Sequence, residues 1–157
     1  MKPIRLFFNS IIAILALTSF TSCSDDDNNE PSTPAAREIA GTYTGDLTCT
    51  VMNSPTTYEN LTITVTATDE TTVTVTLPAF GEAPMALPSI TLPGLKVSGA
   101  DGTYTIAETE VSGKTDNDKN FTCTVQANIS GKTLNINYSL KYGAMPMALI
   151  CNSTATK

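Results

Sequence analysis

Alternation of apolar and polar residues is the feature that most constrains how this chain can fold, and it begins at Gly41. Side chains in a β-strand point to opposite faces in turn, so a period of two predicts a strand with one buried face. The clearest case runs from Phe121 to Ile129. Segments of this kind occupy residues 42–51, 61–67, 73–77, 90–97, 104–111, 121–129, 134–142 and 145–151. Helical periodicity is absent, apart from a possible single turn at residues 35–39.

The predicted strands are joined by connections rich in turn-forming residues, such as those at 68–70, 98–102, 116–119 and 130–132. Short links favour pairing between neighbouring strands, which gives a meander. One apolar face per strand leaves two architectures, a closed barrel or a two-sheet sandwich. Closure removes the exposed edges of the first and last strands. We therefore expect an all-β fold, an eight-stranded antiparallel up-and-down barrel over residues 37–157, with an interior that is packed or holds one small ligand.

The first 22 residues have the three parts of a secretory signal. Lys2 and Arg5 provide the positive start, an apolar stretch follows, and small residues lead to Cys23. Residues 19–23 resemble the bacterial lipobox, in which the cysteine receives a diacylglyceryl group. We therefore expect residues 1–22 to be a lipoprotein signal peptide and Cys23 to be the site of lipid attachment. Simple secretion, with Cys23 present by chance, is the alternative.

Residues 23–36 are predicted to form a flexible tether that begins at the lipidated cysteine. Between Ser24 and Pro34 the chain contains acidic and polar residues and prolines but no large apolar side chain. Such a stretch cannot bury enough surface to offset its ordering entropy. The acidic triplet at residues 25–27 resembles the export signal of Bacteroidota lipoproteins, which indicates the outer membrane and its cell-surface face. The periplasmic face, with an incidental acidic linker, is the alternative.

Composition argues against several functions. Removal of the leader leaves seven basic residues against fifteen acidic ones, which disfavours nucleic acid as a partner. Histidine is absent, so the chain lacks an imidazole general base and the commonest zinc ligand. Glu108 and Glu110 lie two residues apart on one strand, but nothing positions a partner acid for carboxylate chemistry. We expect a non-catalytic protein with no cofactor and no metal site.

A family resemblance rests on the order and spacing of several short segments. They are Ile39 to Leu47, the Thr/Val hairpin, Leu77-Pro-Ala-Phe80, the strand from Ile90 to Val97, Asp101-Gly-Thr-Tyr104, and Gly131-Lys-Thr-Leu134. In this the chain resembles the calycin-like, lipocalin-like barrel domains of Bacteroidota lipoproteins. The resemblance implies an eight-stranded barrel and, more weakly, small-molecule binding. Lipocalins proper carry Gly-x-Trp on the first strand, often with an arginine stacked on the ring. Here Tyr43 takes the place of that tryptophan, and the mature chain offers only Arg37, which precedes the strand.

Two sets of residues are candidates for a site inside the barrel or at its mouth. Cys49, Cys123 and Cys151 all fall on the apolar phase of their strands. Because the first and last strands of a closed meander are neighbours, Cys49 and Cys151 could form a disulfide, which an envelope location permits. Three buried thiols are the alternative. An internal ligand would contact inward-facing or loop residues, namely Tyr43, Ile63, Val75, Phe80, Met85, Ile106, Val125, Tyr138 and Met147.

The segment Gly-x-x-Pro-Met-Ala-Leu occurs twice, at residues 81–87 and again at 143–149. The first copy lies in a proline-rich connection, residues 79–95, that cannot be a regular central strand. This loop could cover the barrel mouth, since methionine adapts to irregular apolar ligands. The alternative is that the methionines simply plug the barrel end. We expect a lipid-anchored envelope protein that binds a small, partly apolar ligand, or else a surface protein with a packed barrel that contacts an envelope glycan or protein.

Overall fold

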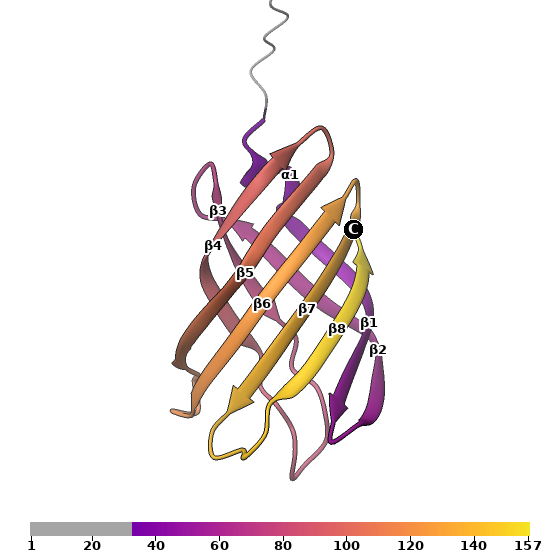
Figure 1. The fold of residues 1–157 in the computed structure, drawn as a ribbon, viewed down its shortest axis with the longest axis vertical. Helices are drawn as coiled ribbons and strands as arrows, with labels where there is room; N and C mark the ends of the chain where they lie inside the picture. Colours follow the sequence, from indigo (N-terminus) through magenta and orange to yellow (C-terminus); the bar gives the residue numbers. More distant parts are fainter. Residues whose placement is uncertain (1–32) are drawn as a thin grey trace, which may run out of the picture. The chain divides into compact units, whose positions relative to one another are not determined.

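The computed structural model describes residues 33–157, which form a closed barrel of eight antiparallel strands, each paired with its neighbour in sequence. The expected barrel is confirmed, and the sandwich is excluded because β1 pairs with β8. Figure 1 shows the strands tilted around the barrel axis. The elements are α1 (Ala35–Ile39), β1 (Gly41–Val51), β2 (Ser54–Ala67), β3 (Thr72–Leu77), β4 (Ile90–Ala100), β5 (Thr103–Lys114), β6 (Asn120–Ser130), β7 (Thr133–Tyr142) and β8 (Leu149–Thr156).

The two ends of the barrel differ in construction. At one end, which we call the helix end, α1 lies beside the short turns β2–β3, β4–β5 and β6–β7 (Figure 1). At the other, the loop end, lie the β1–β2 and β5–β6 turns and two longer connections, residues 78–89 and 143–148. No helix within residues 33–157 is long and apolar enough to span a membrane. The predicted signal peptide, the lipid on Cys23 and most of the tether fall outside the described residues.

The helix end is closed by Tyr43, the residue that corresponds to the lipocalin tryptophan. Tyr43 is fully buried, and its hydroxyl donates a hydrogen bond to the backbone oxygen of Ile39 at 2.7 Å. Where lipocalins often stack an arginine on the ring, this chain has Lys157, whose Nζ lies 5.3 Å from the ring centroid. The same ammonium donates to the carbonyl oxygens of Glu38 and Ala40, at 2.8 and 3.1 Å. Residues from the two ends of the described chain thus meet over one aromatic ring.

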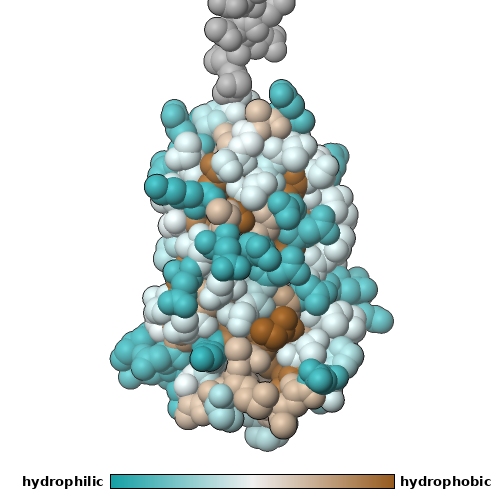
Figure 2. Space-filling view, viewed as in Figure 1, coloured by the Kyte–Doolittle hydropathy of each residue, from teal (hydrophilic) through white to brown (hydrophobic). Residues whose placement is uncertain are grey.

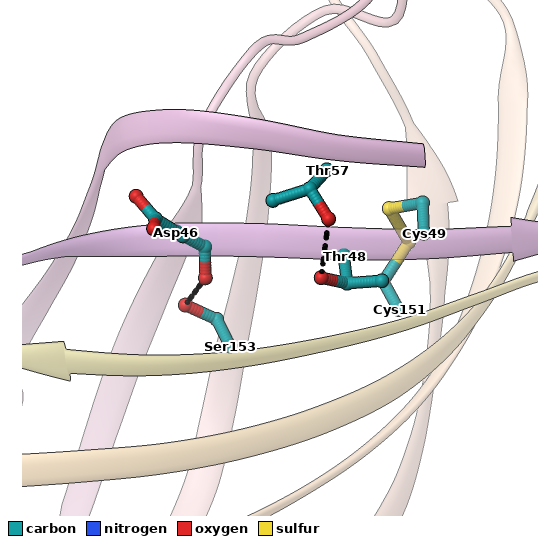
Figure 3. Close-up of a disulfide and its surroundings, with 6 residues drawn as sticks. All are labelled: Asp46, Thr48, Cys49, Thr57, Cys151 and Ser153. Atoms are coloured by element: carbon teal, nitrogen blue, oxygen red, sulfur yellow. Dashed lines mark hydrogen bonds between the residues drawn. A yellow bond between two sulfur atoms is a disulfide. The ribbon is translucent and has the colours of Figure 1, made fainter. Parts of the chain in front are cut away.

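The seam between β1 and β8 is fixed covalently. Cys49 and Cys151 are directly opposite each other in the register and form a disulfide, with their Cα atoms 4.1 Å apart. Figure 3 shows this bridge beside the hydrogen bond that Ser153 donates to the backbone oxygen of Asp46, 2.8 Å long. Ser153 is a serine buried among apolar residues, and its hydroxyl is satisfied across the same seam. Cys123 is a free buried thiol.

One strand and one loop have other bounds than predicted, each for a local reason. β2 begins at Ser54 rather than Leu61, since Met52 and Asn53 both adopt positive φ and form a tight hairpin turn. β4 begins at Ile90, as predicted for the strand over residues 90–97, so the overlapping loop predicted at residues 79–95 was too long. Pro93 and Gly94 fit into this strand because the β3–β4 register shifts opposite them, which is the position where a strand tolerates proline.

The last strand was also placed wrongly. It spans Leu149–Thr156 instead of residues 145–151, and Met145 and Met147 belong to the preceding loop. Their alternation with other residues imitates a strand, but Met145 instead makes a turn in which its N–H donates to the Tyr142 oxygen at 3.2 Å. The true inward positions further along are the small residues Ser153 and Ala155.

Candidate functional site

The interior of the barrel is filled by its own side chains. Six of the residues predicted to line a ligand pocket point inward and are at most 3% exposed: Tyr43, Ile63, Val75, Ile106, Val125 and Tyr138. They belong to a core of apolar residues contributed by every strand and by α1. A space large enough for a water molecule would appear as accessible surface on these side chains. The barrel therefore has a packed core, and these six residues hold the fold together.

Besides the hydroxyls of Tyr43 and Ser153, which are hydrogen-bonded, the core buries the thiol of Cys123 and the hydroxyl of Tyr138. Burial raises the pKa of the Cys123 thiol to about 12, so the thiol is protonated and unreactive at neutral pH. Burial, and the neighbouring Cys123, also raise the pKa of Tyr138. The Tyr138 hydroxyl has no hydrogen-bond partner among the described residues, which is an uncommon and costly condition. Neither group can act as a base or a nucleophile at neutral pH.

The other three predicted lining residues lie outside the barrel interior. Phe80 is half-buried in the 78–89 connection and packs on Tyr58 of β2, with ring centroids 5.1 Å apart. Met85, in the same connection, is 66% exposed, and Met147 is 42% exposed. The prediction that Met147 lines an internal cavity is wrong because β8 starts after it. Met85 does line a cavity, but one at the loop end.

That cavity is a cleft of about 330 Å³ between the two long connections of the loop end. The two copies of Gly-x-x-Pro-Met-Ala-Leu, 62 residues apart in sequence, meet around it. The first copy contributes Pro84, Met85, Ala86 and Leu87, the second contributes Gly143, Ala144 and Met145, and Lys119 and Tyr142 complete the lining. A volume of this size is at the lower limit for small-molecule sites.

Backbone hydrogen bonds hold both walls of the cleft in place. Phe80 and Leu87 exchange two such bonds, of 3.1 and 2.8 Å, which close the first connection into a narrow loop. The N–H of Gly143 donates to the Asn120 oxygen at 2.7 Å and ties the second connection to β6. The cleft is therefore a formed feature of the fold.

Apolar surface is concentrated at the loop end. Four large hydrophobic side chains within residues 33–157 are exposed, and all of them lie at the loop end: Met52, Met85, Met147 and Ile150. Figure 2 shows brown and tan residues gathered over the lower part of the barrel, with hydrophilic residues over its middle. Grouped exposed hydrophobic residues mark a surface that contacts something other than water.

The acidic residues do not assemble into a site. Asp118 lies in the β5–β6 turn at positive φ and pairs with Lys114 at 2.8 Å, in an exposed ion pair. Glu108 and Glu110 are exposed on β5. Within the part of the chain that the structure describes, no three His, Cys, Asp or Glu side chains lie close enough to hold a metal ion.

The fold and the cleft define a calycin-type barrel with a packed core and a site at one rim. Residues 39–152 match the calycin-like beta-barrel domain family, and the chain belongs to this family. It is also similar to the solved structure of a putative outer membrane protein from Bacteroides fragilis, with a TM-score of 0.70 and 22% sequence identity over 80% of this chain. The match covers 53% of that protein, so this chain spans about half its length. None of the curated proteins compared with the chain matches it.

Sequence reasoning missed two parts of this arrangement. Lys157 lies over Tyr43, where lipocalins often have an arginine, and only the pairing of β1 with β8 brings it there. Lys119 joins the cleft from the β5–β6 turn and Tyr142 from the end of β7, and neither belongs to the repeated motif. The repeated heptapeptide was the signal that could have located the cleft, had both copies been assigned to loops.

Proposed function

We propose that this protein is a non-catalytic, lipid-anchored protein of the cell envelope that binds a small, partly apolar ligand in the cleft at its loop end. The observation that carries the proposal is the meeting of the two Gly-x-x-Pro-Met-Ala-Leu copies around one apolar cleft. The ligand lies under the 78–89 loop and outside the barrel, because the interior is filled. The anchor is the lipid on Cys23, and the location is the outer membrane, at the cell surface.

Geometry agrees with such a role. The first described residues lead into α1 at the helix end, so a chain anchored before them holds the barrel by that end. The cleft lies at the opposite end, where it faces away from the anchor. An apolar ligand would be bound mainly by the side chains of Met85, Leu87, Tyr142 and Met145. Methionine side chains adapt to ligands of irregular shape.

The test is titration of a solvatochromic apolar dye onto the purified protein, combined with variants of the cleft. Met85→Ser and Met145→Ser should each weaken dye binding by about fivefold, the equivalent of roughly 1 kcal/mol of lost apolar contact. Met52→Ser is the control, since Met52 is an exposed methionine at the same end that does not line the cleft. Ala144→Phe, which fills the cleft, should abolish binding without loss of stability. Absence of saturable binding, or equal effects of all four substitutions, would refute the proposal.

A second function is favoured by the packed core and the exposed apolar rim. Here the loop end, with Met52, Met147 and Ile150, contacts an envelope protein or glycan directly. A photo-crosslinking residue placed at Met52 should then capture one partner in the native host. The same residue placed at Asp101, at the helix end, should capture none. Equal yields at both positions would argue against a specific contact.

A further inference from the structure

The methionines are distributed in an unusual way. The chain has five, and the four within the described residues all lie at the loop end: Met52, Met85, Met145 and Met147. None is among the fully buried core residues; Met52, Met85 and Met147 are exposed, and Met145 is partly buried against the core. Methionine is ordinarily among the more deeply buried residue types, so its absence from this core and its concentration at one rim need a separate reason.

Three of these methionines belong to the cleft or adjoin it. Met85 and Met145 line it from two different loops, and Met147 follows two residues later in the second loop. The backbone fixes both lining residues in the same way. The N–H of Met85 donates to the Glu82 oxygen at 2.9 Å, and that of Met145 to the Tyr142 oxygen at 3.2 Å. Each methionine therefore closes a tight turn; Met85 is exposed, and Met145 is partly buried and packs against the core.

The shared property of these side chains, beyond being apolar, is a thioether sulfur. Thioethers are neutral, soft ligands that select Cu(I) and ions like it over Mg²⁺, Ca²⁺ or Zn²⁺. We propose that the loop-end cleft binds a soft monovalent cation, Cu(I) or Ag(I), through the sulfur atoms of Met85 and Met145, the two methionines that line it. The ion exchanges bound water for thioether sulfur, and no proton or electron is transferred. This site is separate in chemistry from the proposed apolar ligand and does not depend on it.

The expectation of no metal site rested on the absence of histidine, and a thioether site does not need that residue. The surrounding charges permit the proposed site. Lys119 is the only charged residue that lines the cleft. Its Cδ lies 3.8 Å from the position where a Cβ on Gly143 would be, so its aliphatic stem faces the wall. Replacement of this like charge by Lys119→Gln should strengthen cation binding.

The experiment is titration of Ag(I), which needs no reductant and so leaves the Cys49–Cys151 disulfide intact, in chloride-free buffer. The protein carries Cys23→Ala to remove the thiol outside the described residues, and its methionine methyl groups are labelled with ¹³C for NMR. One equivalent of Ag(I) should shift the methyl resonances of Met85 and Met145, which line the cleft, and leave that of Met52 in place. The double variant Met85→Leu/Met145→Leu should weaken Ag(I) binding by roughly tenfold or more.

Two controls identify the ligand atoms. Cys123→Ala should leave Ag(I) binding unchanged; if it abolishes binding instead, the ion occupies the core thiol and the proposal is overturned. Binding through thioethers should also be independent of pH between about 5 and 8, because these groups do not titrate. Equal shifts of all four methyl groups, or none, would likewise overturn it.

The leucine substitutions separate this proposal from the proposed function. Leucine keeps the apolar volume of methionine but lacks the sulfur. The Met85→Leu/Met145→Leu variant should therefore still bind the apolar dye while it loses Ag(I). Loss of the dye with retention of Ag(I) would contradict the thioether site. If the wild-type protein binds the dye but Ag(I) does not bind, the thioether site is refuted and the proposed apolar-ligand function is retained.

Discussion

The disulfide between β1 and β8 should supply a large part of the stability of this barrel. It joins residues 102 positions apart, so it closes a loop that contains most of the folded domain. We expect the double substitution Cys49→Ala/Cys151→Ala to lower the free energy of unfolding. The decrease should be far larger than the loss of two buried sulfur atoms alone would cause. The effect arises mainly in the unfolded chain, where the cross-link restricts the conformations available.

The magnitude follows from the length of the loop. Chain entropy gives about 4.7 kcal/mol at 25 °C for a loop of roughly 100 residues. Real unfolded chains are more compact than this treatment assumes, so about 3–4 kcal/mol is a reasonable expectation. Total stabilities of single domains are about 5–15 kcal/mol, which means that the variant should be marginally folded. Cys123→Ala, which removes a buried sulfur without opening a loop, should cost about 1–2 kcal/mol.

Urea unfolding followed by far-UV circular dichroism measures both quantities. The double variant should show a lower midpoint and a larger m-value, because the unfolded chain without the cross-link exposes more surface. Cys123→Ala should shift the midpoint with the m-value unchanged. The reasoning is refuted if the double variant keeps the wild-type m-value and its free energy of unfolding falls by no more than twice the decrease caused by Cys123→Ala.

Further predictions concern single groups. Tyr43→Phe should cost about 1 kcal/mol in urea unfolding, since it removes the hydrogen bond to Ile39. Tyr138→Phe should leave the free energy of unfolding unchanged or raise it, because that hydroxyl has no partner among the described residues. An equal decrease for Tyr43→Phe and Tyr138→Phe would contradict this. The Cys123 pKa is raised to about 12, above the unfolded value near 8.5, so stability should be constant below about pH 8 and fall between about pH 9 and 12, by up to roughly 1.4 kcal/mol per pH unit. Cys123→Ala should make stability fall less steeply over this pH range. If the variant shows the same dependence of stability on pH as the wild type, the Cys123 thiol is not its cause. Cys23→Ala should release the protein from membranes with its fold intact, as fractionation would show, and retention would exclude a lipid anchor at Cys23.

The sequence was sufficient for most of the strands because their inward residues are large. Leu61 to Ala67 and Phe121 to Ile129 show a strong period of two, and both segments are strands. Prediction failed where the inward residues are small or where a loop imitates the pattern. β8 shows both effects, since Ser153 and Ala155 carry little apolar signal and Met145-Pro-Met147 has the spacing of a strand.

The candidate site was less predictable because it depends on the way loops meet. Alternation identifies which residues face inward, but not whether the space they enclose is empty. The volume of side chains such as Tyr43 and Tyr138 fills it. The cleft, in contrast, forms where residues 84–87 and 143–145 approach each other across the loop end. No local sequence pattern specifies that approach, although both segments belong to copies of the repeated heptapeptide.

The covalent seam also affects how the protein would respond to proteolysis. Exposed loops are the usual sites of cleavage, and both long connections of the loop end lie between Cys49 and Cys151. A single cut in the 78–89 loop leaves two fragments that the disulfide still joins and that the intact strand pairs still hold in register. A nicked molecule of this kind would run as one species on a non-reducing gel and as two after reduction. Damage at the exposed rim would therefore leave the barrel in place, and the cut protein would not be shed as fragments.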